Sequence, residues 1–145
     1  MRNRTKAREC ALKILYAVDI TKDSPEECVR LFWESYPTIK EEVKEFSSFL
    51  VGGVSKNRPF IDSLISKYAT NWQIQRMAAI DRNVLRIATF ELLFARDIPP
   101  KVSINEAIEM AKKYGDKDSG KFVNGVLDKI NKTEKRDERT PRVKG

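Results

Sequence analysis

The segment MAAIDRNVLRIATFELLFA, at residues 77–95, is apolar around most of the circumference of a helix. A helix of this kind is stable in water only when other parts of the protein cover it on nearly every side. The chain has 145 residues, which is enough for one domain with a single hydrophobic core. We therefore expect a central helix here, with the rest of the chain packed around it.

The other apolar residues recur at intervals of three and four, which is the period of an amphipathic helix. No segment alternates apolar and polar residues as a half-buried strand does. The pattern predicts further helices in six segments: 7–18, 25–36, 39–54, 59–68, 103–114 and 118–130. The expected fold class is all-α, a bundle of about seven helices in two halves.

Capping residues mark where several of these helices begin. Ser24, followed by Pro25, has the composition of an N-cap and first helical position. Ser103 and Glu106 have the spacing of a capping box, in which each side chain bonds the backbone N–H of the other residue. Asp118 is predicted to be the N-cap of the last helix.

The composition excludes most catalytic chemistry. The chain has no histidine, so the commonest general base and metal ligand are both missing. Cys10 and Cys28 do not form a C-x-x-C pair, and we interpret them as buried, reduced thiols. Gly52 and Gly53 lie inside a helical pattern, where close packing explains them better than phosphate binding. We expect a binding protein with no enzymatic activity, no cofactor and no metal site.

The net charge of +7 is concentrated at the two ends of the chain. Residues 129–145 are strongly basic, and residues 1–8 carry four basic side chains and no acid: Arg2, Arg4, Lys6 and Arg8. Such ends are either solubilising tails or electrostatic arms for nucleic acid. The segment 132–145 has no apolar period, so we expect a disordered basic tail. No apolar leader or membrane-length apolar run is present in the sequence, which favours the cytoplasm.

The stretch DSGKFVNGVLDKI, at residues 118–130, combines an apolar stripe with a polar face that includes Lys121, Asn124 and Gly125. Phe122 falls on the boundary between the two. Its ring either holds the helix against the core or lies partly open beside Lys121, where another molecule can approach it.

Two carboxylates of the central segment fall in or near its apolar arc. Glu91 is in the middle of the arc and needs a buried partner, for which Arg8 and Arg86 are the candidates. Asp81 lies near the edge of the arc. It either has a structural role or belongs to a binding surface.

Four stretches together resemble the bacterial NusB family of transcription antitermination factors, from about residue 5 to residue 131. They are ARECALKILY, VLRIATFELLF, IPPKVSINEAIEMAKKYG and DSGKFVNGVLDKI, in this order and at these spacings. The resemblance implies one NusB-like domain at residues 1–131, with an N-terminal half at about 1–70 and a C-terminal half at about 71–131. It also implies binding of single-stranded boxA RNA together with ribosomal protein NusE. Read-through by RNA polymerase in an antitermination complex, notably in ribosomal RNA operons, would follow.

The resemblance also implies an RNA surface. It is built from the basic N-terminal arm, the tyrosine of the first helix, the start of the central helix, and the start of the last helix. In this sequence the matching residues are Arg2, Arg4, Lys6, Arg8, Tyr16, Asp81, Asp118, Lys121, Phe122 and Asn124. The physical basis is that unpaired bases stack on aromatic faces while lysine and arginine hold the phosphates. The alternative is a helical protein-binding adaptor without direct RNA contact, whose basic ends serve solubility.

Overall fold

The computed structural model describes residues 2–134, which contain seven α-helices and one 3₁₀ turn and no β-strand. The expected all-α fold is confirmed. In chain order the elements are α1 (Asn3–Thr21), α2 (Pro25–Ser35), α3 (Glu41–Lys56), α4 (Arg58–Tyr68), η1 (Ile74–Arg76), α5 (Ala79–Phe94), α6 (Pro100–Tyr114) and α7 (Ser119–Thr133).

Helix α5 is the centre of the fold, as its composition predicts. Eleven of its 16 residues are buried, because α1, α3, α4, α6 and α7 all pack against it. The other helices each bury one stripe and expose the opposite face, which is why their apolar residues recur at intervals of three and four.

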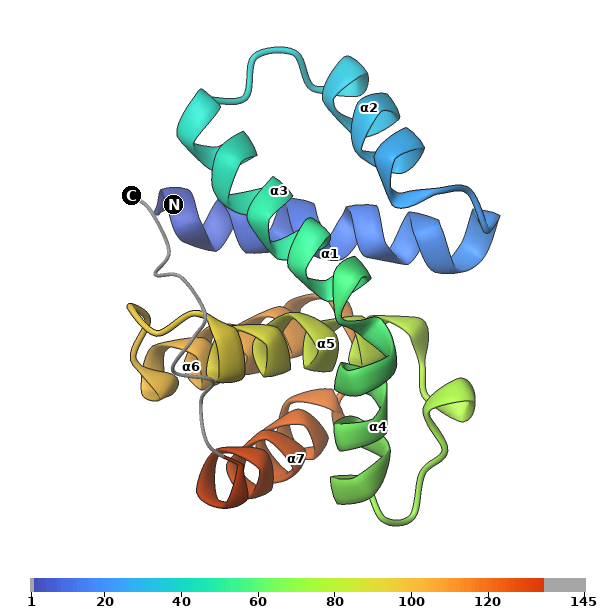
Figure 1. Ribbon diagram of the computed structural model, residues 1–145, viewed down its shortest axis with the longest axis vertical. Coiled ribbons are helices and arrows are strands. Elements are labelled where there is room, and N and C mark those ends of the chain that lie inside the picture. Colours follow the sequence, from blue (N-terminus) through green and yellow to red (C-terminus); the bar gives the residue numbers. More distant parts are fainter. Residues whose placement is uncertain (1, 135–145) are drawn as a thin grey trace.

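The helices form two groups that meet along α5 (Figure 1). In the first group α1 crosses α3, and α2 covers the side of both. In the second group α6 and α7 pack together, and α4 lies against α5 and α7 more than against α3. We therefore propose that α4 belongs with the second half, so that a division of the chain falls near residue 57 rather than residue 70.

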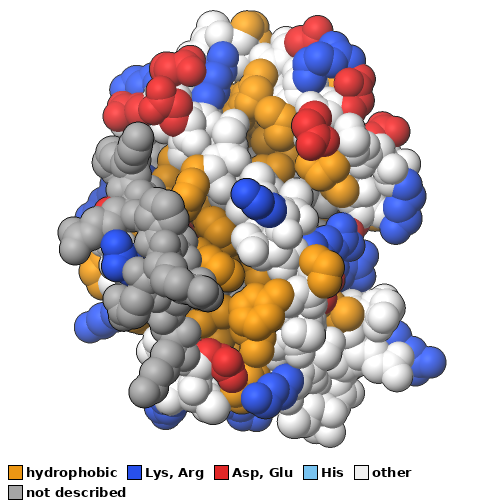
Figure 2. All heavy atoms as spheres, in the orientation of Figure 1, with side chains coloured by type: hydrophobic (Ala, Val, Ile, Leu, Met, Phe, Trp, Pro, Cys, Tyr) orange, Lys and Arg blue, Asp and Glu red, His pale blue; other side chains and the backbone are white. Residues whose placement is uncertain are grey.

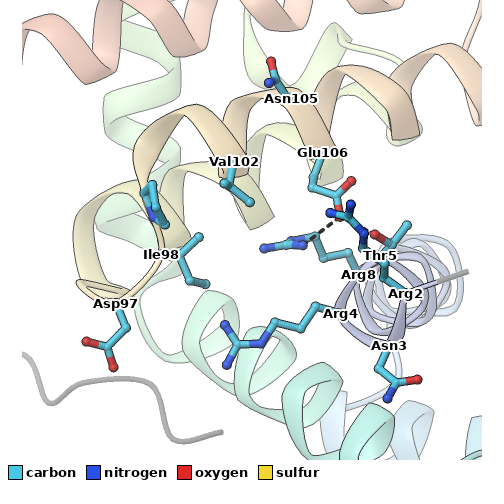
Figure 3. Close-up of a pocket in the computed structure, with 11 residues that line it drawn as sticks. Arg2, Asn3, Arg4, Thr5, Arg8, Asp97, Ile98, Val102, Asn105 and Glu106 are labelled. Atoms are coloured by element: carbon cyan, nitrogen blue, oxygen red, sulfur yellow. Dashed lines mark hydrogen bonds and ion pairs between the residues drawn. The ribbon is translucent and has the colours of Figure 1, made fainter.

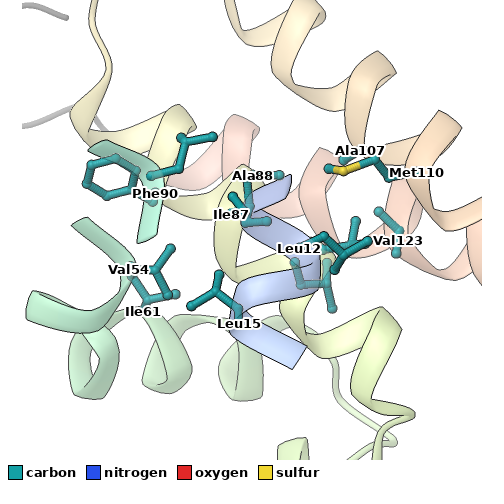
Figure 4. Close-up of a cluster of buried hydrophobic side chains, with 14 of the residues drawn as sticks. Leu12, Leu15, Val54, Ile61, Ile87, Ala88, Phe90, Ala107, Met110 and Val123 are labelled. Atoms are coloured by element: carbon teal, nitrogen blue, oxygen red, sulfur yellow. The ribbon is translucent and has the colours of Figure 1, made fainter. Parts of the chain in front are cut away.

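One continuous core joins the two groups. Leu15 of α1 lies toward Val54 of α3 and Ile61 of α4, and Leu12 of α1 lies beside Val123 of α7 (Figure 4). Cys10 and Cys28 are buried and reduced, in agreement with their interpretation as structural thiols.

Gly53 allows the closest approach of α3 to α5. A Cβ atom at this position would overlap the ring of Phe90, so only glycine permits the observed packing. Close packing is therefore confirmed for Gly53. A Cβ atom at Gly52 would meet nothing within 4 Å, so the neighbouring glycine has no such role.

One of the predicted capping motifs is confirmed and one is wrong. The Ser24 hydroxyl accepts a hydrogen bond from the Glu27 N–H at 3.1 Å, and Pro25 is the first residue of α2. Ser103 and Glu106 do not cap α6, because that helix already begins at Pro100. Proline has the backbone torsion of a first helical residue and lacks the N–H that a cap would satisfy. Ser103 therefore lies one turn inside the helix.

Buried ionic groups connect α1 to α4 and α5. Asp19 of α1 accepts hydrogen bonds from Arg82 at 2.8 Å, Asn83 at 2.8 Å and Arg86 at 3.1 Å, all on α5. Arg86 also pairs with Asp62 of α4 at 2.8 Å. Burial raises the pKa of Asp19, but the hydrogen bonds from Arg82 and Asn83 and the charge of Arg86 outweigh it and lower that pKa to about 2.

The end of the chain differs from its prediction in one detail. Helix α7 continues to Thr133, so the first residues of the expected tail, 132–145, are helical. The remainder of that tail, residues 135–145, lies outside the described residues. Within residues 2–134, no helix has the combination of length and apolarity needed to cross a membrane.

Candidate nucleic-acid interface

The basic residues at the N-terminus belong to a helix rather than to a free arm. Arg2 is the N-cap of α1, and the helix begins at Asn3. A helical phase of 100° per residue places Arg2, Lys6 and Tyr16 on one stripe, and all three side chains are exposed. The first half of the predicted surface is therefore a helix face with two cations and one aromatic ring.

Arg4 points to a different side of α1. Its guanidinium lies 4.5 Å from the ring centroid of Phe46 on α3, a cation–π contact. It also extends across an open cavity between the start of α1 and the start of α6, which Arg2 borders as well (Figure 3). Arg4 thus lies apart from the stripe that carries Lys6 and Tyr16.

The prediction that Arg8 contacts RNA is corrected by the structure. The Arg8 side chain is only 3% exposed, and it donates to both oxygens of Glu91 at 2.8 Å. A third bond of 2.9 Å reaches Glu106, as drawn in Figure 3. Burial lowers the pKa of Arg8, but the two carboxylates outweigh burial and raise it. A guanidinium engaged in this way has no free edge for a phosphate.

The same contacts settle the partner of Glu91. Of the two candidate arginines, Arg8 is the partner, while Arg86 pairs with Asp19 and Asp62. Glu91 is 1% exposed and also accepts a 2.8 Å bond from the Ser103 hydroxyl. The expectation of a buried, paired carboxylate is confirmed.

The start of α7 presents Lys121 and Asn124 to solvent, with Phe122 half-buried beside them. Asp118 occupies the predicted N-cap position of α7, but its side chain makes no capping hydrogen bond to any described residue. The Asp116 carboxylate instead orders the turn before the helix, because it accepts from the Asp118 N–H at 2.8 Å and the Ser119 hydroxyl at 3.3 Å. An Asp that bonds the N–H two residues later forms an Asx turn.

Phe122 has a neighbour that the sequence does not indicate. The ring of Trp72, in the connection between α4 and α5, meets the Phe122 ring edge-on, with centroids 6.3 Å apart and an interplanar angle of 72°. The two rings line an open depression together with Arg76, Asp81, Asp118 and Lys121. We call this depression the aromatic hollow. It brings four predicted residues together and adds two that sequence reasoning missed, Trp72 and Arg76.

Asp81 lies at the inner side of the aromatic hollow, in the first turn of α5. One of its carboxylate oxygens is buried and has no hydrogen-bond partner among the described residues. Burial raises the pKa of the Asp81 carboxyl, the nearby Ser119 hydroxyl lowers it, and the charge of Asp116 adds to the net rise. Asp81 therefore ionises less readily than an exposed aspartate.

Ionic contacts hold the C-terminal end of α1 against the start of α5, which borders the aromatic hollow. Asp19 follows Tyr16 by one turn on α1 and binds Arg82 and Asn83, which directly follow Asp81 on α5. The C-terminal turns of α1 are therefore fixed against the first turn of α5.

Comparison with known proteins identifies relatives over nearly the whole chain. The model of the NusB family matches residues 5–132. Transcription antitermination protein NusB of Anaeromyxobacter dehalogenans (strain 2CP-1) is 50% identical over 127 residues, which are 88% of this chain and 89% of the relative. The protein of the same name from Trichlorobacter lovleyi is 49% identical over 137 residues, 94% of this chain and 96% of the relative.

Solved structures give the same result. T. maritima NusB superposes with a TM-score of 0.85 at 40% identity, covering 93% of this chain and 94% of that chain. A crystal structure of antitermination factors NusB and NusE in complex with double-stranded RNA contains a chain that matches with a TM-score of 0.83 at 33% identity. That match covers 91% of this chain and 98% of the other.

Proposed function

Because the chain belongs to the NusB family, we propose that it is a transcription antitermination factor that binds boxA RNA together with ribosomal protein NusE. The family is non-enzymatic, and this chain is not an enzyme. Its relatives carry the name of antitermination proteins, and one solved relative is a complex with NusE and RNA. The action we propose is read-through by RNA polymerase, notably in ribosomal RNA operons, in the cytoplasm.

The observation that carries the RNA proposal is the aromatic hollow. Unpaired bases stack on exposed aromatic rings, and cations beside the rings hold the backbone. Trp72 and Phe122 supply two adjacent rings, and Arg76 and Lys121 supply the cations. Asn124 lies exposed on the same helix turn as Lys121 and can bond a base edge or a phosphate.

The exposed stripe of α1 extends this surface. Arg2 and Lys6 are free to bind phosphates, and Tyr16 offers a further ring. Asp81 and Asp118 add negative charge to the hollow, so the phosphates are expected to lie toward Lys121 and the α1 stripe rather than inside it. The RNA residues that we propose are therefore the predicted set without Arg8.

We propose that NusE binds on the second group of helices. Phe60 of α4 is 50% exposed and meets the edge of Phe94 of α5, with centroids 6.3 Å apart. Figure 2 shows hydrophobic side chains gathered in the middle of the face of the molecule that it presents. Exposed aromatic residues of this kind are enriched in protein interfaces. A partner here would leave the aromatic hollow open for RNA.

The test is a titration of single-stranded boxA RNA at several salt concentrations, with and without NusE. Replacing Arg2 and Lys6 by Gln removes two phosphate contacts, so the slope of log affinity against log salt should become less steep by about 1.4. Lys40→Gln, at the exposed start of α3, is the matched control and should leave the slope unchanged. NusE should tighten RNA binding, because each partner adds surface for the other.

The same titration distinguishes the proposed RNA-binding function from the alternative of a protein-binding adaptor. A protein that binds NusE but shows no measurable affinity for boxA RNA would be a helical adaptor without direct RNA contact. Unaltered RNA affinity and slope in the Arg2 and Lys6 variant would remove the α1 stripe from the RNA site.

A further inference from the structure

The connection between α4 and α5 holds an exposed tryptophan on a fixed loop. Trp72 is 55% exposed, although Ala69, Ile74 and Met77 on either side of it are buried in the core. The loop is tightened by hydrogen bonds of 2.9 Å from the Trp72 N–H to the Ala69 carbonyl and from the Arg76 N–H to the Gln73 carbonyl. The indole is therefore held outward by its anchored neighbours.

Trp72 separates two depressions of the surface. One is the aromatic hollow, on the side of Phe122. The other lies between the end of α4 and the 3₁₀ turn, and it is lined by the amide side chains Asn71, Gln73 and Gln75. We call this second depression the amide hollow. Trp72 and Arg76 line both.

We propose that Trp72 is a second base-stacking residue, which inserts between two successive unpaired bases of the bound RNA. One base lies in the aromatic hollow beside Phe122, and the next lies in the amide hollow. The proposal rests on the RNA-binding function proposed above and extends the RNA footprint across the α4–α5 connection.

The chemistry of the two hollows fits this occupant. The indole has the largest aromatic face among the side chains, and stacking on it accepts any base. The amides of the second hollow both donate and accept hydrogen bonds, as the edge of an unpaired base requires. The Arg76 guanidinium has no ion-pair partner among residues 2–134, and its place beside both hollows suits the phosphate that links the two bases.

Trp72 can report on its own stacking, because the sequence has only two tryptophans. In a Trp33→Phe protein the fluorescence comes from Trp72 alone, and a boxA RNA of about 12 nucleotides should quench it on binding. Trp72→Ala should weaken RNA binding about tenfold or more, and Trp72→Phe should retain most of the affinity. Tyr36→Ala, which removes an exposed ring on the α2 side, is the matched control and should bind normally.

The melting temperature of Trp72→Ala should stay close to that of the wild type, since the ring is largely exposed. Wild-type RNA affinity in Trp72→Ala, with weakened binding in Phe122→Ala, would overturn this proposal and leave the RNA function standing. A loss of NusE affinity alone would make Trp72 a protein contact and would also overturn it. No RNA binding by the wild-type protein would refute the proposed function and this inference with it.

Discussion

The buried pair of Arg8 and Glu91 offers the sharpest test of how this fold uses its charges. Arg8→Met removes both bonds that the guanidinium donates to Glu91 and leaves a carboxylate that is 1% exposed with Ser103 as its remaining donor. Leaving one member of a buried pair without its partner costs about 3–5 kcal/mol of unfolding free energy. For a chain of this length, that corresponds to a fall of roughly 10 °C or more in melting temperature.

The double variant Arg8→Met, Glu91→Met should be more stable than Arg8→Met alone. It leaves no fully buried charge without a partner, and two apolar side chains of suitable length fill the site. Ser103 loses its acceptor, but a serine inside a helix can bond the carbonyl four residues earlier. Glu106 stays partly exposed, and Thr5 remains hydrogen-bonded to it.

Urea unfolding of the wild type, both single variants and the double variant gives the coupling free energy of the pair. RNA titrations on the same proteins test the functional side, because Arg8 is buried and should not contribute to affinity. The folded double variant should bind RNA within about twofold of the wild type, whereas Lys6→Gln should flatten the salt dependence by about 0.7. A double variant less stable than Arg8→Met, or one that loses RNA affinity as Lys6→Gln does, would refute this account of Arg8.

Three further outcomes are expected. Gly53→Ala should lower the melting temperature, because its Cβ would overlap Phe90 and force α3 away from α5. Gly52→Ala should instead add about 0.5–1 kcal/mol of stability by favouring the helix. The folded protein lowers the pKa of Asp19 to about 2, so the ionised carboxylate contributes about 2 kcal/mol of stability above pH 4. This contribution should be lost as the pH falls through 2, which acid unfolding of Asp19→Asn against the wild type would show. Phe122→Ala should weaken RNA binding by about 1–3 kcal/mol and cost less stability than the 3–5 kcal/mol of a fully buried ring, so normal RNA affinity in that variant would return the ring to a purely structural role.

Much of this fold follows from periodicity alone. A helix that is apolar on nearly every side must be central, and α5 is. Ser24 caps α2 because its short hydroxyl reaches a free N–H within the same turn, which is a purely local interaction. The burial of Arg8 was also within reach of the sequence, since its helical phase lies between those of Leu12 and Leu15 on the apolar arc of α1.

Local signals failed where distant parts of the chain compete for the same group. The hydroxyl of Ser103 bonds Glu91 rather than its own helix end, and Glu106 binds Arg8 from α1. In each case several partners are chemically acceptable, and the packing of other helices decides which one is near.

The sequence by itself determined the helices, the central position of α5 and the basic character of the N-terminal end. Only the tertiary structure decided which basic residues remain free and which rings meet. Trp72 and Phe122 are 50 positions apart and belong to no common pattern, yet the packing of α4, α5 and α7 brings their rings to 6.3 Å. Periodicity indicates which face of a helix is buried, but not which other helix lies beside its exposed face. A binding surface built from several helices depends on that arrangement.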